Sequence, residues 1–377
     1  MTDPSSAPRT IVAVAGDPGG ARALAPVIER LRSRAGVAVR AIAYLHAREV
    51  WGKRHIAFEE ANARASDVLD AVRTIAPDGL LVATSANGVD LERAFTAAAN
   101  ELGLPSVAVV DFWSNYRLRF ESSSGSLELP TRIAVMDAVA EAEMVALGFP
   151  ASRIVVTGQP ALGELVRSLR HKSAIERNST RGDLGLAESD RVILFASQPI
   201  AASPVEWGYS ERTVIPALID ALSSIGRRRG EKLHLVIRPH PRETPFHWAS
   251  PDETALTVQT SALGEGLDVA LAADLVTGMT TVLLVEACLA GCVVASLQPG
   301  LRLEDPLPTN RLGASKAIYS KVVLETVIED LLYSPATRAG ALARCAALEH
   351  DQDAAANVER LILSLIDQAG NEPKRGG

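Results

Sequence analysis

Short apolar runs alternate with amphipathic segments along the first half of the chain. Such runs predict buried strands, and apolar positions spaced three and four apart predict helices between them. We expect strands at 11–15, 37–44, 79–83, 106–110, 132–135 and 154–157. We expect helices at 18–34, 66–75 and 91–102, and one more that ends near residue 147. This alternation predicts a parallel sheet with helices on both faces.

The alternation stops over residues 166–190 and then restarts. That segment is rich in Arg, Lys, Ser and Glu, so we expect a helix end followed by a linker. Beyond it we expect strands at 192–196, 233–237, 271–275 and 293–296. The expected helices are 213–227, one ending near residue 290, 324–333 and 341–369. A second parallel sheet follows from the same reasoning.

The predicted fold class is therefore α/β, with two Rossmann-like, doubly wound parallel-sheet domains facing across a cleft. We expect the first domain over residues 9–165 and the second over 191–354, joined by the linker 166–190. The C-terminal helix, about 355–369, is free to pack back on the first domain. A length of 377 residues fits two domains.

Composition and charge narrow the functional classes. The net charge of -7 gives no electrostatic case for nucleic acid as a partner. Cys288, Cys292 and Cys345 do not have the spacing of a metal site, and an odd cysteine count without a secretory signal indicates a reducing compartment. We expect a cytoplasmic protein without a bound metal. Peripheral membrane contact and a homodimer both stay open.

The loop after the first expected strand contains glycine and leads into a helix. Gly16, Gly19 and Gly20 would let a ligand approach the backbone, and the helix N-terminus favours an anion. Asp17 lies in the same loop and is a candidate general base. The alternative is a tight turn in which Asp17 caps the helix.

Asp111 follows the expected strand 106–110 and has aromatic and Asn neighbours. A carboxylate in that place suits a sugar hydroxyl or general-base catalysis. A helix cap beside a packed aromatic cluster is the alternative. Arg117 and Arg119 could bind an anionic acceptor or be surface charges.

Two loops of the second half carry groups suited to phosphate. Arg238 and Arg242 flank His240, which stands between two prolines after the expected strand 233–237. We expect Arg238 to bind the nucleotide and His240 to bind it and to assist catalysis. Ser197, after the strand 192–196, is a weaker candidate for the same site.

The segment after the expected strand 271–275 also fits a phosphate. Gly278, Thr280 and Thr281 precede a helix, where backbone N–H groups and hydroxyls can hold an anion. An ordinary Thr cap is the alternative. Glu286 lies on an otherwise apolar face of that helix, where a ribose hydroxyl pair or a basic core residue could be its partner.

Together these residues resemble the GT-B glycosyltransferase superfamily. The first half ends in Gly148-Phe149-Pro150 and then Val156-Thr157-Gly158-Gln159-Pro160, similar to the end of a GT-B N-domain. Arg238-Pro239-His240-Pro241 is similar to the His-Pro motif of bacterial capsule, sialyl- and glycerophosphate-polymer transferases. The segment 274–281 with Glu286 resembles the GT-B donor site, in which small polar residues hold phosphates and Glu holds ribose.

The resemblance implies a metal-independent transferase that moves a sugar from a nucleotide sugar to a hydroxyl-bearing acceptor, as in bacterial polysaccharide or natural-product glycosylation. It requires no cofactor beyond the donor; UDP is the first expectation for the nucleotide, and CMP or CDP are alternatives. Arg238, His240, Thr280 and Thr281 would stabilise the leaving phosphate. Asp111 or Asp17 would be the base, with Asp111 preferred for its neighbours.

Two other functions stay open. The UDP-N-acetylglucosamine 2-epimerases and related hydrolases share the fold and, as the resemblance implies, use N-domain carboxylates. Their usual acid after the strand equivalent to 79–83 is absent, because the chain reads Thr84-Ser85-Ala86-Asn87. A non-catalytic nucleotide- or glycan-binding protein is the third hypothesis.

Overall fold

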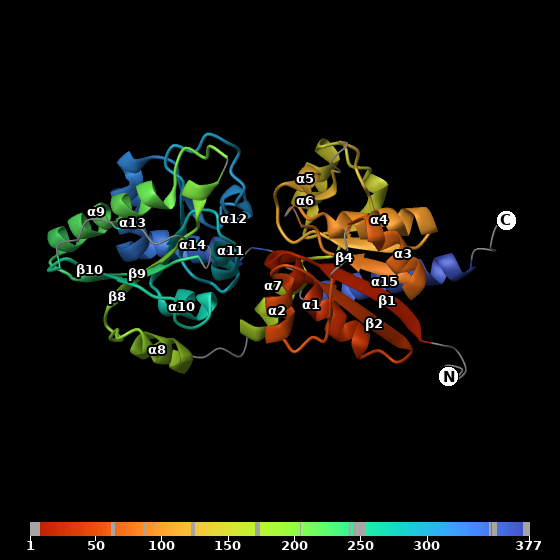
Figure 1. The fold of residues 1–377 in the computed structure, drawn as a ribbon. Coiled ribbons are helices and arrows are strands. Elements are labelled where there is room, and N and C mark those ends of the chain that lie inside the picture. The colour runs from red at the N-terminus through yellow and green to blue at the C-terminus, as the bar shows by residue number, and fades with distance from the viewer. Residues whose placement is uncertain are drawn as a thin grey trace. The chain divides into compact units, whose positions relative to one another are not determined.

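The computed structural model describes residues 8–371 except 62–64, 86–87, 122–124, 170–173, 204, 241–242, 244–246, 248–252, 347 and 349–352. The chain divides into two compact units. The N-unit comprises Met1–Arg167 with His350–Gly377, and the C-unit comprises Ser168–Glu349. Each unit is built on its own parallel sheet (Figure 1).

The N-unit has a seven-stranded sheet in the order β3-β2-β1-β4-β5-β6-β7, with every pairing parallel. The strands are β1 Arg9–Ala15, β2 Val37–Ala43, β3 Glu59–Glu60, β4 Gly79–Val82, β5 Ser106–Val109, β6 Arg132–Val135 and β7 Ile154–Val156. The strand order reverses between β1 and β4. In open parallel sheets, ligands bind beyond the carboxyl ends of the strands at such a reversal.

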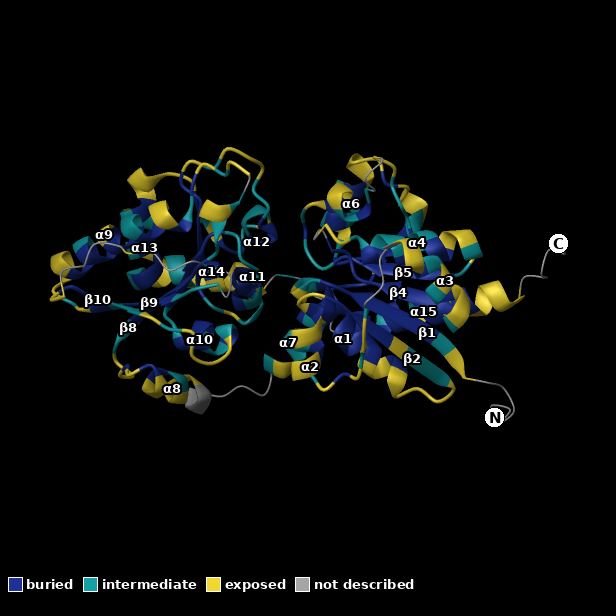
Figure 2. Ribbon diagram, viewed as in Figure 1, coloured by how far each residue is buried: buried dark blue, intermediate teal, exposed yellow. Residues whose placement is uncertain are grey.

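Helices cover both faces of this sheet. They are α1 Pro18–Arg32, α2 Ala47–Lys53, α3 Val68–Ile75, α4 Leu91–Leu102, α5 Tyr116–Phe120, α6 Ala138–Ala146, α7 Pro160–Leu169 and the C-terminal α15 Ala354–Asn371. Short 3₁₀ turns occupy η1 Ala65–Asp67 and η2 Ala151–Arg153. The central strands β1 and β4 are almost wholly buried, because side chains pack on both faces (Figure 2).

The C-terminal helix α15 packs on the N-unit, although the preceding helix α14 belongs to the C-unit. Ile362 and Ile366 join the core of the N-unit sheet, and Glu359 pairs with Arg30 of α1 at 2.8 Å. A Cβ on Gly79 would lie 3.0 Å from Ile366, so glycine lets α15 come close to β4.

The C-unit has a six-stranded sheet in the order β10-β9-β8-β11-β12-β13, again with every pairing parallel. The strands are β8 Arg191–Ala196, β9 Leu233–Arg238, β10 Leu256–Thr260, β11 Leu275–Gly278, β12 Val294–Leu297 and β13 Lys316–Ile318. The reversal of strand order lies between β8 and β11. The predicted two-sheet α/β fold class is confirmed in its two parallel sheets.

The helices of the C-unit are α8 Ala174–Asp183, α9 Glu211–Arg229, α10 Gly266–Ala272, α11 Val282–Leu289, α12 Pro308–Arg311, α13 Leu324–Tyr333 and α14 Pro335–Ala346. The 3₁₀ turns are η3 Ile200–Ala202 and η4 Lys321–Val323. None of the described helices combines the length and apolar character that crossing a lipid bilayer requires.

The structure corrects three expectations for the second half. Residues 271–272 end α10, so the strand expected at 271–275 begins only at Leu275. The helix expected over 341–369 is divided between α14 and α15. The edge strands β10 and β13 were not predicted, because half-exposed, polar edge positions lack the apolar run of a buried strand.

The segment 166–190, expected to be a linker, contains α8 packed in the C-unit. The side chain of Arg181 is only 2% exposed. Its guanidinium donates to the carbonyls of Ala272 (2.8 Å), Ala187 (3.3 Å), Glu188 (2.7 Å) and Asp190 (3.0 Å), and to Asp274 (3.1 Å). A buried arginine therefore anchors α8, and sequence patterning looks for apolar positions in a packed helix.

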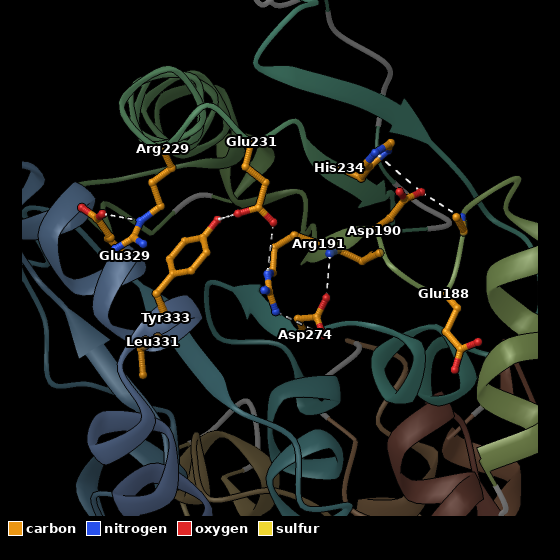
Figure 3. Close-up of polar contacts among 12 residues, drawn as sticks. Glu188, Asp190, Arg191, Arg229, Glu231, His234, Asp274, Glu329, Leu331 and Tyr333 are labelled. Carbon is orange, nitrogen blue, oxygen red and sulfur yellow. Dashed lines mark hydrogen bonds and ion pairs between the residues drawn. The ribbon is translucent and has the colours of Figure 1, made fainter.

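Asp274 also organises the amino-terminal edge of the C-unit sheet (Figure 3). Its carboxylate accepts the backbone N–H of Val192 at 2.9 Å and lies 4.0 Å from Arg191. Beside it, Tyr333 donates to Glu231 at 2.7 Å while the Arg229 guanidinium lies 3.9 Å from the tyrosine ring centre. This edge is opposite to the carboxyl edge and has a structural role.

Replacing Arg181 by Met should destabilise the C-unit by about 3 kcal/mol, because several buried carbonyls and a carboxylate lose their donor. Urea denaturation followed by circular dichroism measures the change. Arg177→Met is the matched control, since Arg177 bonds the same Asp274 from the same helix but is 43% exposed, and it should cost less than about 1 kcal/mol. Equal effects would contradict this account of α8.

Candidate functional site

Three neighbouring loops meet at the carboxyl edge of the C-unit sheet. Ser197 and Gln198 follow the central strand β8, which pairs with β9 on one side and β11 on the other. His240 follows β9, and Thr280 follows β11. Parallel pairing places the three loop starts side by side at the strand-order reversal.

Side chains tie these loops together. The Gln198 Oε1 atom accepts the Thr280 backbone N–H at 2.8 Å and the Thr280 hydroxyl at 3.2 Å. The Ser197 hydroxyl donates to one oxygen of Glu243 at 2.8 Å, and the other oxygen accepts the His240 backbone N–H at 3.1 Å. The structure thus brings Ser197, His240 and Thr280 together at one edge of the sheet, and their role in binding stays a prediction.

Sequence reasoning missed Glu243. Its side chain joins the β8 and β9 loops and so fixes the backbone beside His240. Its position three residues after His240 gives the short reach that such a loop-closing carboxylate needs. Pro241 and Arg242, which belong to the predicted motif, lie outside the described residues.

Arg238 is the last residue of β9, and its guanidinium is used within the unit. It donates to the carbonyls of Leu263 and Gly264, both at 2.7 Å. These bonds hold the segment before α10 against the end of β9. Arg238, which the sequence predicts to bind phosphate, therefore makes structural hydrogen bonds within the C-unit.

The residues at the start of α11 divide into packing and site positions. Gly278 belongs to β11, and a Cβ there would lie 2.9 Å from the Ala196 carbonyl oxygen, which explains the glycine by packing. The Thr281 Oγ1 atom caps α11 by accepting the Leu283 N–H at 3.3 Å. Glu286 lies half-buried on the same helix.

A polar network beside these loops is buried at Tyr209 and Gln298 and reaches the exposed Tyr319. The Tyr209 hydroxyl donates to Gln298 at 3.2 Å, and Gln298 donates to Asp305 at 3.0 Å. Asp305 also accepts the Tyr319 hydroxyl at 2.7 Å. Burial is the main cause that raises the pKa of Tyr209, and likewise raises that of Tyr319 to about 12, so both stay neutral near pH 7.

At the carboxyl edge of the N-unit, the glycines of the first loop allow close packing. A Cβ on Gly16 would lie 2.2 Å from the Tyr44 ring, and one on Gly19 would lie 1.9 Å from an Asp111 carboxylate oxygen. A Cβ on Gly20 would meet Ala83 at 2.5 Å. Asp17 is half-buried and is the N-cap residue of α1, but its side chain makes no cap hydrogen bond to the helix.

Asp111 forms an ion pair with Arg119, and their side chains are 15% and 10% exposed. Arg119 also donates to the carbonyls of Thr84 at 2.6 Å and Ser114 at 2.9 Å. Neither alternative for Arg119, an anion-binding residue or a surface charge, describes this buried pair. Arg117, in contrast, stays exposed and pairs with Glu121 at 3.5 Å.

Glu92 is a buried carboxyl that sequence reasoning also missed. It is 4% exposed and accepts the Gly16 N–H at 2.9 Å and the Ser85 hydroxyl at 2.5 Å, while the Tyr44 hydroxyl bonds its second oxygen. Burial raises the pKa of Glu92 above its ordinary value, and the charge of Asp17 adds to this effect. Bonds from Ser85 and Tyr44 act in the opposite direction.

Glu92→Gln should gain stability relative to the wild type as pH rises. A carboxyl with a raised folded pKa imposes no penalty below its unfolded pKa, and the folded state loses stability as pH rises through the folded pKa. Glutamine keeps the acceptor oxygen but cannot ionise. The difference in Tm, variant minus wild type, should therefore grow as pH rises above the ordinary pKa of a glutamic acid, about 4.3. Calorimetry measures it.

Glu101→Gln serves as the control, because Glu101 is an exposed carboxylate on the same helix α4. Its hydrated charge should give a smaller pH-dependent difference. A Glu92→Gln difference that stays constant or shrinks with pH would contradict the described environment of Glu92.

Comparisons with known proteins identify the fold of this chain. No protein-family model and no curated protein matches the chain. Solved structures do match. The UDP-GlcNAc 2-epimerase from Neisseria meningitidis bound to UDP-GlcNAc is 15% identical with a TM-score of 0.67, covering 94% of this chain and 100% of its own.

Two glycosyltransferases match over similar lengths. A glycosyltransferase from Rickettsia africae ESF-5 is 11% identical with a TM-score of 0.64, covering 97% of this chain and 100% of its own. The glycotransferase of kitacinnamycin is 14% identical with a TM-score of 0.63, covering 96% and 99%. This chain has the GT-B fold. At these identities the likeness extends to the fold alone.

Metal ligands do not gather anywhere in the part of the chain that the structure describes, where no group of three or more His, Cys, Asp or Glu side chains could hold an ion. The three cysteines are free thiols in the C-unit. Burial and the neighbouring Cys345 raise the pKa of Cys292 to about 12, which keeps that thiol protonated and unreactive.

Proposed function

We propose that the protein is a glycosyltransferase that binds a nucleotide sugar at the carboxyl edge of the C-unit and transfers the sugar to a hydroxyl acceptor. One observation carries the proposal: Gln198 and Glu243 hydrogen-bond the loops after β8, β9 and β11 into a single polar surface at the strand-order reversal. Such a preorganised edge is where this architecture binds nucleotides.

The donor phosphates would lie at the N-terminus of α11. This eight-residue helix begins at Val282, directly after its cap Thr281, and its dipole and first backbone amides favour negative charge there. Gln198 holds Thr280 beside that N-terminus. His240 would add a donor to the leaving phosphate, and Glu286 would accept from the ribose hydroxyls. UDP is the proposed nucleotide; the Neisseria meningitidis enzyme, which shares the fold, is described as bound to UDP-GlcNAc.

We assign the base to Asp17 and give Asp111 a supporting role. Asp111 forms an ion pair with Arg119, and its carboxylate lies where a Cβ on Gly19 would be. Asp17 follows β1 at the strand-order reversal and is half-buried. In the reaction the acceptor oxygen bonds the anomeric carbon as its proton passes to the Asp17 carboxylate. The bond from that carbon to the phosphate oxygen breaks, and its electron pair leaves with the nucleotide.

A 2-epimerase is the second candidate, because Glu92 brings a carboxyl from α4 to the end of β4, where the sequence itself places no acid. Proton removal and return at one carbon of the sugar needs acid–base groups that reach it. The Glu92 carboxyl is hydrogen-bonded by Ser85 and Tyr44, and Asp111 forms an ion pair with Arg119. Glycosyl transfer needs only one general base, so these two engaged carboxyls favour transfer over epimerisation.

Incubation with nucleotide sugars separates the two activities. Chromatography of the products measures nucleotide release. We expect this release to depend on an added acceptor. Epimerised or hydrolysed sugar formed without an acceptor would instead support the second candidate and overturn the first.

Asp17→Asn should lower kcat by about 10²- to 10⁴-fold, as expected for loss of a general base, and leave the donor Kd unchanged. Asp111→Asn should lower the Tm more and kcat less, because it leaves the buried Arg119 without its carboxylate. Steady-state kinetics with calorimetric Kd values measures both. An active Asp17→Asn enzyme beside an inactive, folded Asp111→Asn enzyme would reverse the assignment.

A thermal-shift screen with UDP, CDP, CMP, GDP and dTDP tests the nucleotide site. At a ligand concentration about 100 times Kd, binding stabilises the folded state by about 2.7 kcal/mol, and we expect UDP to give the largest shift. Gln198→Leu should reduce that shift, because Thr280 loses its acceptor. Ser224→Ala, on α9 and bonded to Glu325, is the control. No shift with any nucleotide would sink the proposal.

A further inference from the structure

The first loop of the N-unit is held at two consecutive backbone amides. The Gly16 N–H donates to Glu92 at 2.9 Å. The Asp17 N–H donates to the Ser85 Oγ atom at 3.1 Å, and the Ser85 hydroxyl donates to the same Glu92 oxygen at 2.5 Å. Both amides therefore end, directly or through Ser85, at one buried carboxyl oxygen.

Tyr44 fixes the second oxygen of that carboxyl. Its hydroxyl bonds Glu92 from the end of β2, and its ring occupies the place that a Cβ on Gly16 would take. Glycine at position 16 is thus needed for Tyr44 to reach Glu92. The carboxyl joins the loop after β1, the end of β2 and the loop after β4 at the reversal in strand order.

A carboxyl in this position is costly for a helix that only needs to pack. Glu92 is 4% exposed, and burying such a group costs free energy that an apolar side chain of similar size would avoid. Asp17 makes no cap bond to α1, so the helix itself does not hold the loop through that side chain. The carbonyls of Gly16 and Asp17 accept the N–H groups of Ala47 and Ala21, both at 2.9 Å, and the Glu92 carboxyl adds the anchor for the two amides of the same residues.

We propose that Glu92 is a positioning residue that holds Asp17 in place for catalysis, through the Gly16 amide and through Ser85. The proposal rests on Asp17 being the base of the proposed transfer reaction. Glu92 does not touch the reacting groups in this account. It removes the freedom of the backbone that carries Asp17, and small displacements of a base lower the rate strongly.

The test compares Glu92→Leu, Glu92→Gln and the surface control Glu101→Leu from the same helix α4. Leucine removes both acceptor oxygens, whereas glutamine keeps the oxygen that receives Gly16 and Ser85. Hydrogen–deuterium exchange of a peptide covering residues 15–21 reports the amides without any substrate. Steady-state kinetics with a nucleotide sugar reports kcat and the donor KM separately.

In Glu92→Leu we expect faster exchange across residues 15–21 and a fall in kcat on the order of 100-fold, with the donor KM unchanged because the donor is held by the C-unit. Glu92→Gln should recover most of the slow exchange and of the kcat. Glu101→Leu should match the wild type in both measurements. Thermal melts establish that each variant is folded.

A folded Glu92→Leu enzyme with wild-type exchange and wild-type kcat would overturn the proposal. So would faster exchange with unchanged kcat, since the loop would then be held for stability alone. If the wild-type protein itself transfers no sugar, the proposed function fails, and with it the catalytic part of this inference. The exchange data would still decide whether Glu92 fixes the loop.

Discussion

Parallel strand pairing is the constraint on which the rest of this structure depends. All strands of a sheet point the same way, so every strand-to-helix loop of a unit emerges at one edge. Polar groups brought together there must find hydrogen-bond partners, because burial without a partner is costly. In both units polar side chains supply these partners: Gln198 and Glu243 in the C-unit, and Glu92 in the N-unit.

The two edges are built for different tasks. In the C-unit, Ser197, Gln198 and Glu243 leave the start of α11 and the His240 loop in one preorganised surface that suits an anionic ligand. In the N-unit, Glu92 hydrogen-bonds the loop after β1, and the ion pair of Asp111 with Arg119 holds the loop after β5. The half-buried Asp17 follows β1 at the strand-order reversal, and our proposal assigns it the role of base.

The fold followed from sequence because buried parallel strands give short apolar runs that patterning detects. The helix at 91–102 and the strand at 132–135 were predicted with the bounds observed. The edge strands β10 and β13 were not, since their exposed positions are polar. The polar sequence of 166–190 predicts a linker, whereas the structure has α8 there, anchored by the buried Arg181.

The candidate site could be predicted from the sequence only in part. Loops after strands could be located, so Ser197, His240 and Thr280 were found together. The hydrogen-bond partners of the side chains could not be predicted from the sequence. A glutamate in the first turn of α4 is the usual pattern of a solvated helix start, and only the fold turns Glu92 inward.

The central claim is that the nucleotide binds the carboxyl edge of the C-unit. Hydrogen–deuterium exchange of the intact protein with and without saturating UDP tests it most directly. The account predicts slower exchange in peptides covering 196–200, 238–243 and 278–284. Protection confined to the N-unit, or no protection at all, would contradict it.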